Sequence, residues 1–92
     1  MNKRAFVQKK HNLLESNFED CAMLYDVEVG RYYVLNNVGS LVWGQINEKV
    51  GIAIETIIGN MQALYPSIET IEQDVILFIE EAVEKGIILL GE

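Results

Sequence analysis

Residues 26–43 read D-V-E-V-G-R-Y-Y-V-L-N-N-V-G-S-L-V-W, and the predicted fold depends most on these residues because they join a hairpin directly to a capped helix. Gly30 accepts a positive φ without a Cβ clash, so the chain can reverse there. The run from Arg31 to Leu35 is rich in aromatic and β-branched residues, which favours a return strand. The apolar run from Cys21 to Tyr25, bounded by acidic residues, predicts the strand before the turn.

Side chains alternate between the two faces of a strand, so the return strand has two distinct sides. Tyr32 and Val34 are expected on one face, and Arg31, Tyr33 and Leu35 on the other. If this strand is the outer one of the hairpin, its unpaired amides and carbonyls can pair with an extended peptide of compatible pattern. The sequence therefore predicts a strand edge as the first candidate binding feature.

The next predicted element is a helix that carries the single tryptophan, Trp43. Asn36 or Asn37 can accept a hydrogen bond from the free amides of the first turn and so begin this helix. Trp43 is expected to anchor the core, because a buried Trp removes a large area from water. Beside it, apolar residues recur at helical spacing, namely Val38, Leu41, Val42 and Ile46.

Two more helices are predicted in the second half of the chain. One begins near Ile54 and ends at Pro66, which cannot continue a helix. Thr70 and Gln73 form a capping-box pattern, so the last helix is expected to run from there to an αL stop at Gly86. The last helix has more apolar positions than one core-facing stripe requires, so it is buried on two sides or keeps apolar surface for a partner. The apolar positions of the first of the two are Ile54, Ile57, Ile58, Met61, Leu64 and Tyr65.

The two ends of the chain complete the predicted architecture. Phe6 to Lys9 predicts a short first strand, and residues 11–20 are expected to form a polar loop. Leu13, Leu14 and Phe18 are expected to anchor this loop in the core. Ile87 to Leu90 is expected to pack back as a final strand or an extended tail. The order predicts an α+β fold with winged-helix architecture, in which a small sheet is followed by three helices.

The composition predicts a single compact domain spanning residues 1–92. Half of the 92 residues are apolar, which is enough for one core and leaves no room for a second domain. The apolar runs fall far short of the roughly 20 residues of a membrane span. The basic start lacks the apolar segment of a secretory signal, so a soluble cytoplasmic protein without a membrane partner is expected. Cys21 has no second cysteine and is expected to fill a strand position as a small hydrophobe.

The net charge of −7 argues against nucleic acid as a partner. Phosphate contacts from basic residues are the usual source of affinity for DNA. The last predicted helix would read the DNA in a winged-helix regulator, yet Lys85 is its basic residue against a run of acidic ones. A DNA-binding regulator therefore remains an alternative, although the negative charge of the protein disfavours binding to DNA phosphates.

The sequence has no pattern of a catalytic, metal or cofactor site. His11, the single histidine, lies in a polar segment and is expected to be solvated. Glu80 and Glu81 point to different faces of a helix, and the carboxylates near them form no alternating oxygen-ligand loop. They predict a solvated acidic face or a site for a basic peptide segment. The expected protein is therefore not an enzyme and needs no cofactor.

The residues that carry these features resemble a known family. The run G-R-Y-Y-V-L-N-N-V-G-S-L-V-W, the spacing of Ile54, Ile57, Met61 and Tyr65, and the ending D-V-I-L-F-I-E-E-A-V-E-K-G-I-I are similar to the PqqD-like proteins, also called RiPP recognition elements. The resemblance covers about residues 23–90. It implies a winged helix-turn-helix fold in which a three-stranded antiparallel sheet precedes three helices.

The resemblance also implies a non-catalytic function, which is to bind the leader peptide of a ribosomally synthesised precursor so that modifying enzymes can act on the rest of it. In the family the leader adds as a strand to the third β-strand and leans on the third helix. These elements match residues 31–35 and the helix after Thr70. The implied peptide-binding residues are Arg31, Tyr32, Tyr33, Val34, Leu35, Asp74, Leu77, Phe78 and Glu81.

Three alternatives remain open for the function and partners of such a protein. The small size and the L-N-x-V-G-x-x-x-W pattern look most like the leader-binding subunit of lasso-peptide biosynthesis, which works with a leader peptidase and a cyclase. The stand-alone chaperone of pyrroloquinoline quinone synthesis, which partners a radical SAM enzyme, shares the same outline. A homodimer that pairs edge strand to edge strand would use the same surface. One departure is Ala53, where the family often has a capping Thr or Ser, so this helix is expected to start later or to be capped from a loop.

Overall fold

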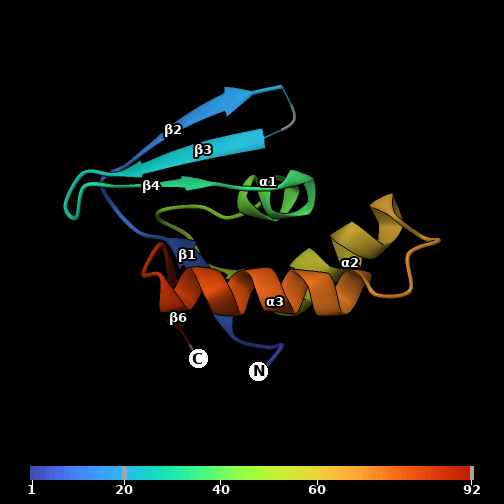
Figure 1. Cartoon of the computed structure of the whole chain (residues 1–92). Coiled ribbons are helices and arrows are strands. Elements are labelled where there is room, and N and C mark those ends of the chain that lie inside the picture. Colours follow the sequence, from blue (N-terminus) through green and yellow to red (C-terminus); the bar gives the residue numbers. More distant parts are fainter. Residues whose placement is uncertain (20, 92) are drawn as a thin grey trace.

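The computed structural model describes residues 1–19 and 21–91, so Asp20, at the end of the predicted loop, lies outside the described residues. Within them the chain forms two antiparallel sheets and three helices around a shared hydrophobic core (Figure 1). The sheet that holds the predicted hairpin comes before all three helices in the chain. The predicted α+β fold is confirmed.

The first sheet consists of β2 (Leu13–Phe18), β3 (Cys21–Asp26) and β4 (Arg31–Val34), in that order and all antiparallel. β3 is the central strand, so β2 and β4 are the two edges of this sheet, as Figure 1 shows. Among the described residues, no further strand pairs with the outer edge of β2 or of β4.

The predicted hairpin is confirmed as β3 and β4. Gly30 has a φ of +69° in the turn, and the two strands pair from Arg31 opposite Asp26 onward. The predicted alternation is also confirmed along the strand. Tyr32 and Val34 are exposed, while on the other side Tyr33 is half-buried and Leu35 is buried.

The prediction of a polar loop over residues 11–20 is wrong, because residues 13–18 form β2. Leu14 and Phe18 are not core anchors, since they are 61% and 69% exposed. Only Leu13 of the three predicted anchors packs against the core, where it is half-buried. An edge strand with one solvated face can carry polar residues, so its sequence need not show an apolar pattern.

The second sheet places β1 (Phe6–Lys9) between β5 (Ile52–Ala53) and β6 (Ile88–Gly91). The predicted first strand is therefore present, but it belongs to this sheet and not to the sheet of the hairpin. The predicted final strand is also present and pairs antiparallel with β1, with Leu90 opposite Val7. The second sheet thus joins the two ends of the chain.

The three predicted helices are α1 (Asn37–Trp43), α2 (Ile54–Leu64) and α3 (Ile71–Glu84). α1 begins with Asn36 as its N-cap, whose Oδ1 accepts a hydrogen bond from the Gly39 amide at 2.7 Å. Among the described residues no helix combines the length and the apolar character that crossing a membrane would require.

α2 is capped from a distant part of the chain. Ala53 at its N-cap position makes no side-chain hydrogen bond. Instead the Ile54 amide donates to the Ala5 carbonyl at 2.9 Å, and the Glu55 amide donates to the Lys3 carbonyl at 2.8 Å. The N-terminal segment therefore satisfies amides that a helix start leaves free. Of the two expected outcomes, a later start does not occur, since the helix begins at Ile54, and the capping comes from the N-terminal segment.

α3 begins directly after Thr70 as predicted, but the capping box is not formed. The Thr70 hydroxyl donates to the Asp74 carboxylate at 3.3 Å and makes no cap bond to the backbone. With φ −90° and ψ 5°, Thr70 does not have the extended backbone that N-cap residues usually adopt. At the other end, Gly86 has a φ of +79°, and the Ile87 amide donates to the Ala82 carbonyl at 3.0 Å, as in a Schellman motif.

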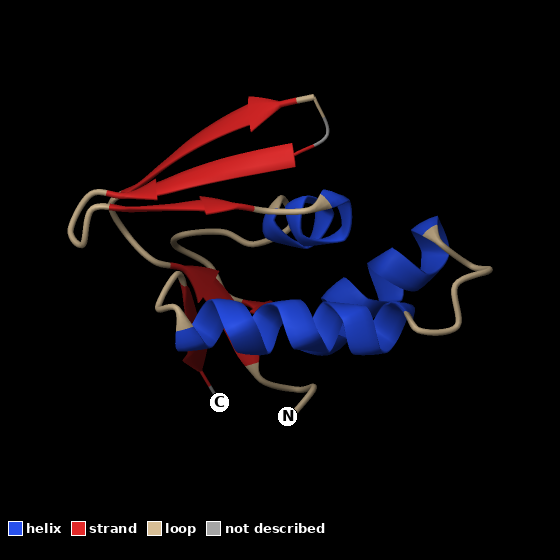
Figure 2. Cartoon of the chain, in the orientation of Figure 1, coloured by secondary structure: helices blue, strands red, loops and turns tan. Residues whose placement is uncertain are grey.

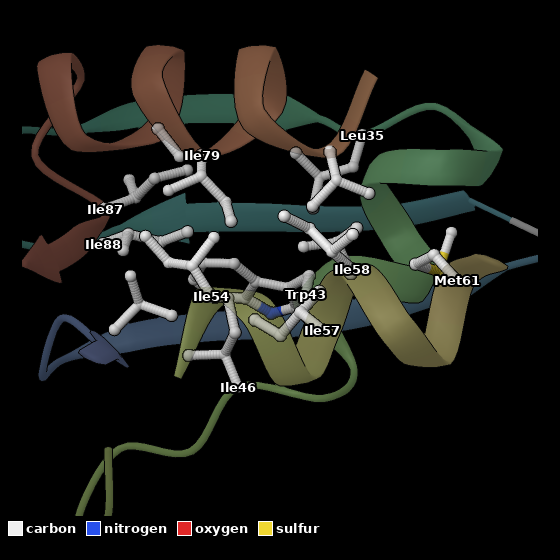
Figure 3. Close-up of a cluster of buried hydrophobic side chains, with 14 of the residues drawn as sticks. Leu35, Trp43, Ile46, Ile54, Ile57, Ile58, Met61, Ile79, Ile87 and Ile88 are labelled. Carbon is white, nitrogen blue, oxygen red and sulfur yellow. The ribbon is translucent and has the colours of Figure 1, made fainter. Parts of the chain in front are cut away.

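The core gathers side chains from all three helices and both sheets, and Figure 3 shows Trp43 among isoleucines of α2 and α3. Trp43 is 2% exposed, and its Nε1 donates to the Glu15 carboxylate at 2.7 Å, so the predicted core anchor is confirmed. Burying a side chain of this size stabilises the fold by roughly 3 kcal/mol. Leu41 and Leu64, predicted on apolar stripes, are exposed instead, because both flank an open hollow between α1 and α2.

Candidate functional site

β4 presents an unpaired edge. The Leu35 amide donates to the Ala22 carbonyl at 2.9 Å, so the backbone groups of Leu35 point toward β3. Backbone groups alternate along an antiparallel strand, so those of Tyr32 and Val34 point away from β3. Among the described residues no strand pairs with that side of β4, as can be followed in Figure 2. The N–H and C=O groups of Tyr32 and Val34 are therefore available to an added strand.

Ser40 of α1 closes the hydrogen-bond ladder where β4 ends. Its Oγ accepts a hydrogen bond from the Ala22 amide at 2.8 Å and donates one to the Leu35 carbonyl at 3.3 Å. The hydroxyl thus replaces a direct bond between the strands at the point where the chain turns into α1. This arrangement fixes the end of β4 to both β3 and α1, so the open edge has a defined position.

Two neighbouring hollows lie along α3, and β4 lines the first of them. The first, of about 210 Å³, lies between β4 and the C-terminal half of α3. The second, of about 340 Å³, lies between the start of α1 and the middle of α3. Phe78 and Glu81 line both hollows, so the two adjoin each other. The other lining residues are Tyr32, Tyr33, Val34, Leu35, Ala82, Lys85 and Ile87 in the first, and Asn36, Val38, Asp74 and Leu77 in the second.

A third hollow, of about 430 Å³, continues from the first toward the turn between β3 and β4. It shares Tyr33 and Lys85 with the first hollow and is also lined by Lys10, Asp26, Val29, Arg31 and Gly86. The three hollows together are called the β4–α3 groove below. β4 lines the first and third hollows, the start of α1 lines the second, and α3 or its C-cap residue Lys85 lines all three.

Every site residue predicted from the sequence lines the β4–α3 groove. Arg31 lies in the third hollow, residues 32–35 in the first, and Asp74 and Leu77 in the second. Leu77 is 56% exposed, which accounts for part of the surplus apolar surface predicted for this helix. The structure therefore brings the predicted residues together, while their role in binding stays a prediction.

The sequence reasoning missed several lining residues, of which Lys85 is the clearest. Lys85 follows Phe78 and Glu81 at helical spacing, so the helical period places it on the same face as those two residues. Its Nζ lies 5.8 Å from the centre of the Tyr33 ring, within the range of a cation–π interaction. Asn36 and Ile87 were missed for another reason, since they reach the groove from the ends of other elements.

Charge is distributed unevenly along the groove. Asp74 and Glu81 are the charged residues of the second hollow, which is therefore acidic. Arg31, Lys85 and Lys10 bring positive charge to the third hollow, where Asp26 offsets one of them. A bound chain would thus meet opposite charges at the two ends of the groove.

Lys10 and Asp26 form a partly buried ion pair that lines the third hollow. The Lys10 Nζ donates to the Asp26 Oδ2 at 2.7 Å, and Asp26 is 1% exposed. The hydrogen bond from Lys10 lowers the pKa of the Asp26 carboxyl, assisted by the backbone amides of Val29 and Glu28 and opposed by burial. The same hydrogen bond raises the pKa of Lys10. The pair ties the segment after β1 to the hairpin turn.

The groove offers backbone hydrogen-bonding groups, apolar walls and fixed charges. Within the described part of the chain, no group of three or more His, Cys, Asp or Glu residues is placed to hold a metal ion. His11 is exposed and makes a 2.8 Å contact through Nδ1 with Glu48, and Cys21 is half-buried at the start of β3. The groove residues suit noncovalent binding of an extended chain.

Known proteins share this fold. The sequence model of a family described as coenzyme PQQ synthesis protein D (PqqD) matches residues 21–88. Among solved structures, the chain is similar to TbiB1 in complex with the TbiA(beta) leader peptide, with a TM-score of 0.76 and 24% identity over 88% of this chain and 93% of that one. No curated protein matches the sequence. The match to the solved structure shows that the two proteins have the same fold.

Proposed function

The chain belongs to the PqqD family, and from this membership we propose that it binds the leader peptide of a ribosomally synthesised precursor without catalysing a reaction itself. The observation that carries the proposal is the open edge of β4 beside α3, with the β4–α3 groove between them. A structural relative, TbiB1, forms a complex with a leader peptide. We further propose that residues 1–92 act as one recognition domain.

The leader binds as an added strand. Its backbone pairs with the free N–H and C=O groups of Tyr32 and Val34, and each such hydrogen bond contributes about 0.5–1.5 kcal/mol. Alternate side chains of the leader then enter the groove, since side chains alternate along a strand. Leu77 and Phe78 form the apolar wall on the helix side. The backbone pairing supplies affinity, and the wall supplies selection among peptides.

The charges of the groove select the leader's sequence further. Asp74 and Glu81 favour Lys or Arg next to the apolar anchor of the leader. The net charge of −7 also attracts a basic peptide over a distance and speeds its association. A basic leader with one or two apolar anchors is therefore the preferred ligand.

The finer assignment is lasso-peptide biosynthesis, in which the bound leader is presented to a leader peptidase and a cyclase. The L-N-x-V-G-x-x-x-W pattern at residues 35–43 supports it through resemblance. The alternative within the family is a peptide chaperone for a radical SAM enzyme in pyrroloquinoline quinone synthesis or a related pathway. Co-purification in the presence of leader discriminates the two, because the peptidase is retained in the first case and the radical enzyme in the second.

Two further alternatives make different predictions. A winged-helix regulator would need a basic recognition helix, whereas α3 carries Glu72, Asp74, Glu80, Glu81 and Glu84. A homodimer through β4 would compete with the leader for the same edge. Leader affinity would then fall as the protein concentration rises, and a 1:1 complex would replace the dimer in a sedimentation experiment.

The deciding experiment is fluorescence anisotropy of a labelled leader from the precursor encoded beside this protein, titrated with the protein. A scrambled leader of the same composition and a DNA duplex are the controls. Saturable binding of the leader alone supports the proposal. Equal binding of the scrambled leader, preference for DNA, or no binding would contradict it.

A further inference from the structure

Gly39 lies in direct contact with the wall of the groove. It is buried in the first turns of α1, and a Cβ placed on it would lie 2.9 Å from both Cδ1 and Cε1 of Phe78. The same Cβ would lie 3.1 Å from the Asn36 Oδ1. Carbon atoms pack at about 3.5–4.0 Å, so the Phe78 ring occupies space that any larger residue at position 39 would need.

The backbone of α1 does not require a glycine at this position. The glycines with positive φ among the described residues are Gly30 and Gly86, whereas Gly39 lies within the helix. Inside a helix, alanine is intrinsically the better residue, because glycine loses more conformational freedom on folding. The reason for a glycine here is therefore the space that it leaves for Phe78.

Phe78 lines both the first and the second hollow, so a shift of its side chain changes the shape of both. Gly39 also affects a second lining residue, since its amide donates to the Asn36 side chain at 2.7 Å. One glycine on α1 thus positions two residues of the groove, one from α3 and one from the loop before α1.

We infer that Gly39 determines which side chains the β4–α3 groove accepts, an inference that rests on the proposed function. The bare Cα lets the Phe78 ring lie back against α1, which leaves room for a bulky apolar side chain of the leader beside it. A methyl group at position 39 would displace the ring by roughly 0.6–1 Å to reach ordinary contact. The methyl group would stand on the α1 side of the ring, and the two hollows that Phe78 lines are open space into which the ring can shift.

The test is Gly39→Ala, with leader affinity measured by anisotropy and folding by thermal unfolding. The variant is expected to fold and to bind the leader about tenfold more weakly, which is typical of overpacking by one methyl group. A leader whose apolar anchor is shortened to alanine should lose much less affinity, because it needs less room. Gly59→Ala is the matched control. Gly59 is an exposed residue of α2, a Cβ on it meets nothing within 4 Å, and its replacement should leave binding unchanged.

A second background tests whether the effect passes through Phe78. In Phe78→Leu the smaller side chain leaves space beside position 39, so adding Gly39→Ala should change affinity less than about twofold. A further tenfold loss in that background would overturn the inference, since the alanine would then act by another route. If Gly39→Ala alone does not fold, the double variant should fold, and its failure to do so would also overturn the inference.

The outcomes separate this inference from the proposed function. Normal leader binding by folded Gly39→Ala overturns the role of Gly39 and leaves the proposed function intact. No leader binding by the unaltered protein overturns both. Weaker binding by Gly39→Ala together with normal binding by Gly59→Ala supports both.

Discussion

The sheet of β2, β3 and β4 has two open edges that differ in their surroundings. β2 is the longer edge, with six residues against four in β4, so hydrogen bonding alone would favour it as the site for an added strand. β4, however, lines two of the three hollows of the β4–α3 groove, and none of the three includes a residue of β2. An edge provides backbone pairing, whereas selection of a peptide also requires a wall for its side chains.

The two edges also differ in how their side chains are used. Glu15 of β2 accepts from Trp43 Nε1 at 2.7 Å and from Lys9 Nζ at 3.2 Å, so it supports the core. Tyr33 of β4 faces α3 across the groove and makes its charged contact with Lys85. Glu15 of β2 thus stabilises the fold, while Tyr33 of β4 lines the β4–α3 groove.

Proline scanning of the two edges should give the largest contrast. Val34→Pro removes an amide that points away from β3 and places ring carbons at the edge, so leader affinity should fall by at least about 30-fold. Asn17→Pro makes the same change on β2, because alternate backbone groups there also face outward, and should leave affinity unchanged. Anisotropy measures binding, and circular dichroism checks that both variants fold. Equal losses at the two edges would show that β4 is not the selected edge.

Aromatic truncation should give the next largest effect. Tyr33→Ala or Phe78→Ala removes a wall of the groove, and each should weaken leader binding about tenfold with the fold retained. Phe18→Ala removes a ring of the same class from β2, where it is 69% exposed, and should have no effect on binding. Titration calorimetry of the three variants checks this. Unchanged affinity in a folded Tyr33 or Phe78 variant would remove that residue from the site.

Charge reversal at the acidic hollow should have a smaller effect. Asp74→Lys and Glu81→Lys place positive charge beside a basic leader, and each should weaken its binding about fivefold at low salt. Glu80→Lys is the control, since Glu80 is an exposed neighbour on α3 that does not line the groove. Affinities measured at several salt concentrations should converge as salt screens the charges. Insensitivity to reversal and to salt would mean that the acidic face is only solvated.

The smallest effect on binding is expected from pH near neutrality, because the Lys10–Asp26 pair keeps its charges there. The folded-state pKa of Asp26 lies below its ordinary value of 3.8, so the pair's stabilisation is present above that value and is lost as the pH falls through the lowered pKa. The raised pKa of Lys10 makes the loss at high pH begin above 10.5. Urea unfolding at several pH values should show a fall in the free energy of unfolding below about pH 4 that is reduced in Asp26→Asn. An identical acid profile in that variant would contradict this assignment.

Much of the candidate site could be predicted from the sequence, because it lies on locally specified elements. Gly30 marks the turn, the aromatic run after it marks β4, and the helical period of α3 places Asp74, Phe78 and Glu81 on neighbouring turns. Lys85 was missed although the same period would have included it. The sequence shows Gly39 only as part of a motif. Its contact with Phe78 could not be predicted, because it is made between two helices that are far apart in the sequence.

The errors lie where distant pairings decide the structure. The polar sequence of β2 resembles a loop, because an edge strand with a solvated face needs no apolar pattern. Phe6–Lys9 was correctly predicted as a strand, yet its place between β5 and β6 depends on residues near both ends of the chain. Thr70 had the right residue type for a cap but not the backbone conformation.

The hairpin, the three helices and the alternation along β4 follow from local sequence, because turn chemistry and side-chain period act over a few neighbouring residues. The three-dimensional fold was needed to show which sheet each strand joins, which of two open edges lies beside α3, and that Phe78 contacts Gly39. These features depend on burial and pairing between residues far apart in the chain. A local sequence pattern does not reveal the free energy of these long-range contacts.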